Sequence, residues 1–167
     1  MTKLPPGVIE SQLKGLIWGY DLIIAVTKAQ QISNSQYRQA LMDTKKAVEN
    51  GDREIIKKID QLAQRLVNRE KTVVGKKLDE FTVMTGVDLK GKLISWEYTV
   101  SSRTAFSVIK DNQEIFRTSQ TKRMCRDASS NERKVIDLIF AGNYQFQLNY
   151  KLSGGSEELA VIIKSCD

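Results

Sequence analysis

The chain has two cysteines and no histidine, and these two facts limit the chemistry that its side chains can do. Cys125 and Cys166 both stand at boundaries of expected elements among polar neighbours, a setting that favours a structural disulfide. Two unrelated reduced thiols are the alternative interpretation. Histidine is the usual general base near neutral pH, so its absence excludes Ser-His-Asp and Cys-His mechanisms.

The remaining side chains that can do chemistry are carboxylates. A pair of them can hydrolyse a glycosidic bond, but the carboxylates of this chain stand in no pattern that separates them from solvated surface charge. Two cysteines 41 residues apart are a poor start for a zinc site, and no phosphate-binding glycine motif occurs. We therefore expect no catalytic residue, no metal and no cofactor. A hydrolase that relies on carboxylates alone is the third of three hypotheses for the function. Its candidate residues would be Asp79/Glu80, Asp88, Glu97 and Glu157/Glu158.

The positive charge of the chain is spread along its whole length. The net charge is +6, and residues 1–50, 51–100 and 101–167 each contribute +2. A nucleic-acid-binding protein usually concentrates its charge on one face, so nucleic acid is an unlikely partner. One local cluster is a candidate anion-binding site, and a second basic cluster lies earlier in the chain. The residues are Arg117, Lys122, Arg123 and Arg126 for the first and Arg65, Arg69, Lys71, Lys76 and Lys77 for the second.

The sequence of residues 1–70 predicts a helical region of about three helices. The first, Val8–Val26, has apolar residues on more than half of its circumference. Glu10, Lys14 and Asp21 argue against a membrane span or a signal peptide. This helix is either buried within the monomer or a contact for a partner or a second copy. The candidate partner-binding residues are Trp18, Tyr20, Leu22 and Ile23.

The second and third helices are marked by capping residues. Ser33 or Ser35 begins the second helix, and Asn50-Gly51 ends it. Asp52 then caps the third, whose apolar residues continue to Val67. Because the connection is only about two residues long, we expect the two helices to pack antiparallel as a hairpin.

Residues 71–167 read as a separate α+β domain. Alternating apolar residues predict strands near 81–86 and 93–100, with Ile94, Trp96, Tyr98 and Val100 as the buried face. A helix-compatible segment follows at 104–124, breakable at Asp111-Asn112, and a capping box at Ser129–Glu132 opens another helix. Strands at 144–150 and 159–163 complete a β-β-α-α-β-β order. We expect a mostly antiparallel sheet with helices on one face, and residues 159–163, apolar on both faces, inside it.

The C-terminal half resembles an uncharacterised disulfide-bearing domain of exported bacterial envelope proteins. The resemblance covers about half the chain. It implies export and a disulfide, but no known activity and no catalytic residues. The matching features are Leu78–Thr82, Gly91-Lys92-Leu93 with Tyr98-Thr99, Cys125 before a helix, Asp137–Tyr150, a glycine turn, an apolar strand and Cys166.

Together these observations predict a non-catalytic protein-binding or accessory protein of the bacterial cell envelope. An adaptor, a secretion-system accessory or an immunity-type protein would each fit, located in the periplasm or elsewhere in the envelope. The partner would be another protein, with homo-oligomerisation through the first helix as a further possibility. The alternative is a cytoplasmic module that binds anions or nucleic acid through the basic clusters.

Overall fold

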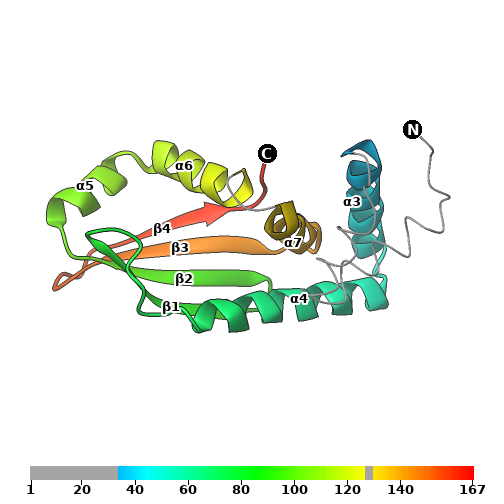
Figure 1. Ribbon diagram of the computed structural model, residues 1–167, viewed down its shortest axis with the longest axis horizontal. Helices are drawn as coiled ribbons and strands as arrows, with labels where there is room; N and C mark the ends of the chain where they lie inside the picture. Colours follow the sequence, from blue (N-terminus) through cyan, green and yellow to red (C-terminus); the bar gives the residue numbers. More distant parts are fainter. Residues whose placement is uncertain (1–33, 127–129) are drawn as a thin grey trace. The chain divides into compact units, whose positions relative to one another are not determined.

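The computed structural model describes residues 34–126 and 130–167 of the 167-residue chain. The predicted first helix, with Trp18, Tyr20, Leu22 and Ile23, therefore lies outside the described residues, as does part of the predicted capping box at Ser129. The described elements are α3 (Asn34–Glu49), α4 (Arg53–Lys71), β1 (Thr82–Lys90), β2 (Leu93–Val100), α5 (Arg103–Asp111), α6 (Gln113–Cys125), α7 (Ser130–Ala141), β3 (Gln145–Leu152) and β4 (Glu158–Ile163) (Figure 1).

The described chain forms two compact units. The helical unit contains α3, α4 as far as Ala63, and α7. The sheet unit contains α4 from Gln64 onward, α5, α6 and the four strands. None of the described helices is both long and apolar enough to cross a membrane.

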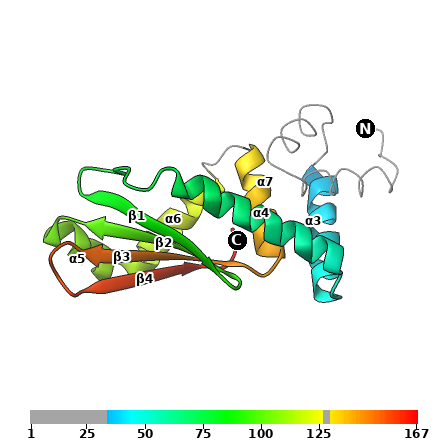
Figure 2. The same ribbon diagram turned by 90° about the horizontal axis from the view of Figure 1, so that it is seen from below.

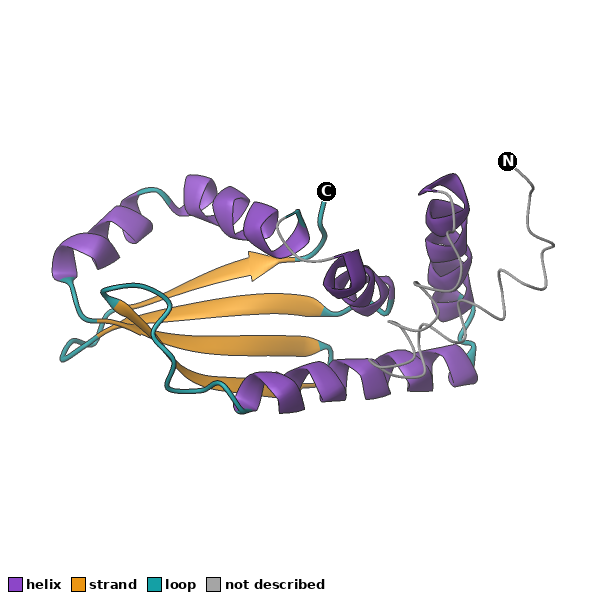
Figure 3. Ribbon diagram, in the orientation of Figure 1, coloured by secondary structure: helices purple, strands orange, loops and turns teal. Residues whose placement is uncertain are grey.

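The sheet confirms the expected α+β class but is mixed. Its strand order is β1-β2-β3-β4. The two outer pairs are antiparallel, whereas β2 and β3 run parallel, with Ile94 opposite Phe146 and Val100 opposite Leu152. A parallel pair needs a long crossover, and the three helices α5, α6 and α7 supply it. Figure 3 shows the four strands side by side, with α5 and α6 beside them.

The observed order is β-β-α-α-α-β-β, one helix more than predicted. The extra helix arises because the helix-compatible segment at 104–124 is divided at Asn112, within the Asp111-Asn112 pair at which the sequence makes it breakable. The φ of −129° and ψ of 42° of Asn112 are not helical. The Asn112 side-chain amide donates to the Val108 carbonyl oxygen at 2.8 Å, which closes the end of α5. The same residue then precedes the first turn of α6, so it caps one helix and starts the next.

One face of the sheet carries the core of the sheet unit, as predicted, although Tyr98 on that face is only partly buried. Ile94 and Val100 are fully buried, Trp96 nearly so, and the Trp96 ring meets the Phe146 ring edge-on at 5.0 Å. Helix α5 packs on β2 and β3, and α6 packs on β4 (Figure 2). Phe106 of α5 is 1% exposed in this core. The opposite face presents mainly polar side chains on β2 and β3, such as Glu97, Gln147 and Asn149.

The expectation that residues 159–163 lie inside the sheet is wrong, because β4 is an edge strand. Leu159, Val161 and Ile163 are buried, whereas Ala160 and Ile162 on the other face are exposed. A strand with apolar residues on both faces therefore need not lie between two other strands. In β4 the apolar side chains of the second face are exposed.

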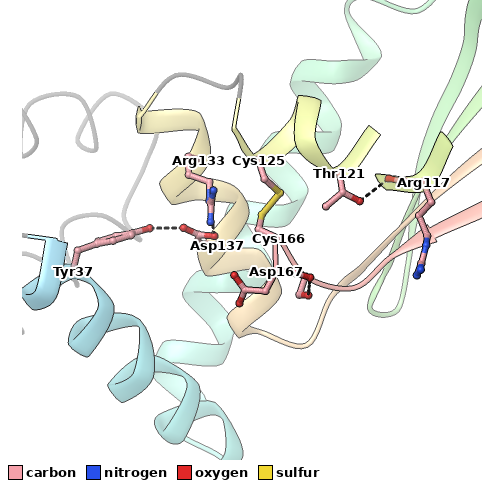
Figure 4. Close-up of a disulfide and its surroundings, with 9 residues drawn as sticks. Tyr37, Arg117, Thr121, Cys125, Arg133, Asp137, Cys166 and Asp167 are labelled. Carbon is pink, nitrogen blue, oxygen red and sulfur yellow. Dashed lines mark hydrogen bonds and ion pairs between the residues drawn. A yellow bond between two sulfur atoms is a disulfide. The ribbon is translucent and has the colours of Figure 1, made fainter. Parts of the chain in front are cut away.

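The predicted antiparallel hairpin of the second and third helices is also wrong. Gly51 ends α3 with a φ of +75°, and Asp52 caps α4 by accepting from the Ile55 N–H at 3.2 Å, as the sequence indicated. However, α3 packs against α7 rather than along α4. The Tyr37 hydroxyl donates to the Asp137 carboxylate at 3.0 Å, and Arg133 donates to the same carboxylate at 3.0 Å (Figure 4).

Candidate binding site

The predicted disulfide between Cys125 and Cys166 is formed (Figure 4). It joins the last residue of α6 to the segment that follows β4, with the two Cα atoms 5.6 Å apart. Cys125 is 2% exposed. The bond closes 41 residues of chain into a loop that contains α7, β3 and β4, and it holds α6 beside the end of the edge strand.

Beside the disulfide lies an open cavity of about 320 Å³, which we call the α6–β4 groove. One wall comes from a single face of α6, because Arg117, Thr121 and Cys125 are spaced four residues apart. The other wall is the end of β4 and the residues after it. The complete lining is Arg117, Thr118, Thr121, Lys122, Cys125, Arg126, Ile162, Ile163, Lys164, Ser165, Cys166 and Asp167.

The groove has an excess of positive charge. Arg117 is held by Glu114 at 2.6 Å, one turn earlier on α6. Lys122, Arg126 and Lys164 have no ion-pair partner within the described ranges 34–126 and 130–167. A side-chain carboxylate, that of Asp167, also lines the groove. Three unpaired cations around one carboxylate favour an anionic occupant such as a carboxylate or a phosphate.

The structure brings together three of the four predicted anion-binding residues. Arg117, Lys122 and Arg126 line the groove, whereas Arg123 does not. Arg123 instead lies near Tyr98 and Tyr150, where its charge favours the ionised form of each phenol. Sequence reasoning did not include Lys164. Its position two residues before Cys166 was a usable signal, because a disulfide to Cys125 must bring it close to α6.

Buried Tyr150 and partly exposed Tyr98 form an aromatic stack under α6. The rings of Tyr98 and Tyr150, opposite each other on β2 and β3, are stacked at 5.0 Å. Phe116 of α6 meets Tyr150 edge-on at 5.1 Å. Burial raises the pKa of Tyr98 to about 12, and the Glu70 carboxylate adds to the rise. Burial is also the largest cause that raises the pKa of Tyr150, and the negative charge that Tyr98 carries when ionised is the second. The stack therefore stays neutral and fixes α6 on the sheet.

A second cavity, of about 350 Å³, lies on the open face of the sheet. Three of the polar side chains that line it are hydrogen-bonded to one another. The Asn149 side-chain amide donates to the Glu97 carboxylate at 2.7 Å, and the Gln147 side-chain amide donates to the side-chain oxygen of Asn149 at 2.7 Å. These groups order the polar face of the sheet, and the arrangement contains no nucleophile paired with a base.

The other candidate groups from the sequence are dispersed. Arg65, Arg69 and Lys71 lie on α4, and Lys76 and Lys77 lie in the connector to β1, and none of them lines either of the two cavities. Within 34–126 and 130–167 there is no group of three or more Cys, Asp or Glu residues placed to hold a metal ion.

Comparison with known proteins adds one likeness in fold. No family model matches the chain, and no curated protein matches it. A solved structure described as "a putative secreted protein" from Pseudomonas aeruginosa superposes with a TM-score of 0.55 at 9% sequence identity. The match covers 65% of this chain and 93% of that one. At this identity the likeness concerns the fold alone.

Proposed function

We propose that this protein is a non-catalytic binding protein of the bacterial cell envelope that holds another protein through the α6–β4 groove. The observation that carries the proposal is the Cys125–Cys166 disulfide, which fixes a helix and an edge strand around cations that have no ion-pair partner among the described residues. Such a site can bind an acidic partner without any chemical step. An adaptor, a secretion-system accessory or an immunity-type protein would each use it in this way.

Two observations support the envelope as the compartment. Structural disulfides persist in oxidising compartments and are rare in the cytosol of most organisms. The structural neighbour is described as a secreted protein, although that description belongs to the neighbour.

The same cations favour a second candidate function, a cytoplasmic module that binds anions or nucleic acid. Lys122, Arg126 and Lys164 would then contact phosphates. This candidate predicts retention on DNA that falls steeply as salt rises. It also predicts reduced cysteines in protein recovered from the host.

The experiment that separates these candidates follows the tagged chain in its native host. Cells are fractionated, and thiols are trapped by acid-quenched alkylation before mass spectrometry. We expect the protein in the envelope fraction with a linked Cys125–Cys166 peptide, and a co-purifying protein that is lost in the Lys122→Glu/Arg126→Glu variant. The matched control is Lys45→Glu, which reverses an exposed charge on α3. Two alkylated thiols in a cytosolic fraction would reject the proposal, and salt-dependent DNA retention would favour the second candidate.

A further inference from the structure

The outer edge of β4 is available for pairing with another strand. Within the described residues β4 pairs only with β3. The Leu152 N–H donates to the Glu157 carbonyl oxygen at 3.2 Å, which marks these two as a hydrogen-bonded pair. Since such pairs alternate along an antiparallel ladder, the backbone groups of Ala160 and Ile162 point away from β3.

This edge lacks the usual protection against strand addition. Natural edge strands are blunted by prolines, bulges or charges along the strand. Residues 159–163 contain no proline and no charge, and their pairing with β3 shows no break in register. Glu158 and Lys164 stand only at the two ends. An unprotected edge of this kind pairs readily with an extended segment unless something covers it.

The α6–β4 groove reaches the C-terminal end of this edge. Ile162 and Ile163 point to opposite faces of the sheet, yet both line the groove, so the groove passes around the end of β4 at its open edge. The Ile162 side chain is 39% exposed there. Across the groove, α6 presents Thr118 and Lys122. A strand laid on β4 would thus have backbone partners on one side and cationic side chains on the other.

We propose that an extended acidic segment of the partner protein adds to β4 as a fifth strand. Its backbone pairs with Ala160 and Ile162, and its carboxylates lie beside Lys122, Arg126 and Lys164. The charge of the groove selects this occupant, because acidic side chains neutralise cations that the described chain leaves unpaired. The inference rests on the proposed protein-binding function and names the kind of partner.

The first test uses a synthetic probe. The ¹⁵N-labelled protein is titrated with a capped hexapeptide that alternates glutamate and valine, and with a lysine-valine peptide as control. We expect the acidic peptide alone to shift the amide signals of Ala160, Ile162 and Lys164. It should also slow amide hydrogen exchange at Ala160 and Ile162. Reversing Lys122 and Lys164 to glutamate should weaken binding by about tenfold or more. No shift with the acidic peptide would overturn the inference.

A proline variant tests strand pairing itself. Ile162→Pro removes an N–H that points outward, so the pairing with β3 is kept, as is typical of prolines on edge strands. Ile162→Val is the matched control. We expect the proline variant to keep its folded spectrum and lose at least about tenfold in peptide affinity, while the valine variant binds like the original chain. If the proline variant does not fold, slowed exchange at Ala160 and Ile162 in the original chain decides.

Four other results would overturn the inference. Inorganic phosphate that produces the same shifts, with peptide affinity kept by Ile162→Pro, would make the groove a simple anion site. A dimer formed through β4 in sedimentation equilibrium would make a second copy the occupant. Peptides that fail to bind while a partner still co-purifies from the host would reject strand addition and leave the proposed function standing. Loss of every partner would reject both.

Discussion

Replacement of Cys166 by serine should destabilise the sheet unit by about 2–4 kcal/mol. The disulfide closes a loop with a sequence separation of 41 residues. For a loop of that length the chain-entropy model gives about 4 kcal/mol at 25 °C, as an idealised upper value. Cys166 is only partly buried, so serine at this position adds little cost of its own. The effect acts mainly on the unfolded chain, which gains freedom when the loop opens.

The assay is unfolding in urea, monitored by tryptophan fluorescence. Trp96 is 7% exposed and packs against Phe146, so its emission reports the sheet unit. Both proteins carry Trp18→Phe, which leaves Trp96 as the only tryptophan. We expect a lower midpoint and a larger m-value for the variant, because an opened loop exposes more surface on unfolding.

Cys125→Ser is the matched control, since it removes the same bond. Cys125 is 2% exposed, so a serine hydroxyl there is buried, and without a partner it costs about 1–3 kcal/mol more. The expected order of stability is therefore the original chain, then Cys166→Ser, then Cys125→Ser. A loss below about 1 kcal/mol for Cys166→Ser, with an unchanged m-value, would refute the loop-entropy reasoning.

Three further predictions concern other parts of the chain. A Cβ at position 142 would lie 2.5 Å from Ile59 Cγ2, so Gly142→Ala should cost about 1–3 kcal/mol; thermal melts should show a smaller cost in an Ile59→Ala background, and equal costs would argue against the clash. Because the pKa of Tyr98 rises to about 12 on folding, the unfolded chain ionises first and stability should fall between pH 10 and about 12. In urea titrations at each pH, Tyr98→Phe should lessen that fall in stability. An unchanged dependence of stability on pH would contradict the assignment of the fall to Tyr98. Trp18→Ala should abolish a partner contact or give a smaller sedimenting species at unchanged melting temperature; unfolding of a chain that was already monomeric would contradict the interface.

Local signals in the sequence predicted the local structure well. The Asn50-Gly51 stop and the Asp52 cap place the boundary between α3 and α4 correctly, because both depend on the conformational preferences of single residues. Alternation of apolar residues along β2 identifies its buried face, because successive side chains of a strand point to opposite sides of the sheet. The disulfide was predictable from the placement of its cysteines.

Relations between elements were harder to predict. Asp111-Asn112 marks where the segment at 104–124 can break, but the break itself depends on the side-chain bond from Asn112 to the Val108 carbonyl oxygen, which competes with helix continuation. The edge position of β4 and the parallel pairing of β2 with β3 follow from the path of three helices, which periodicity does not encode. The packing of α3 on α7 joins residues about 100 positions apart, as the Tyr37–Asp137 bond shows.

For the binding site, the sequence supplied the cations and the cysteines but not their common surface. Arg117, Lys122 and Arg126 meet in one groove because helical spacing and the disulfide combine. The contribution of β4 does not follow from the sequence, because a run that is apolar on both faces predicts an interior strand for residues 159–163. An edge strand adds both Lys164 and an unpaired backbone edge to the site.

The most direct test of a protein-binding groove is site-specific photo-cross-linking in the native host. A photoreactive residue at Thr118, on the groove wall of α6, is compared with one at Ser95, on the opposite face of the sheet. We expect a single protein cross-linked from position 118 in the envelope fraction, none from position 95, and loss of the product when Lys122 and Arg126 are reversed to glutamate. Absence of any product from position 118, or a cross-link to nucleic acid, would contradict the proposed function.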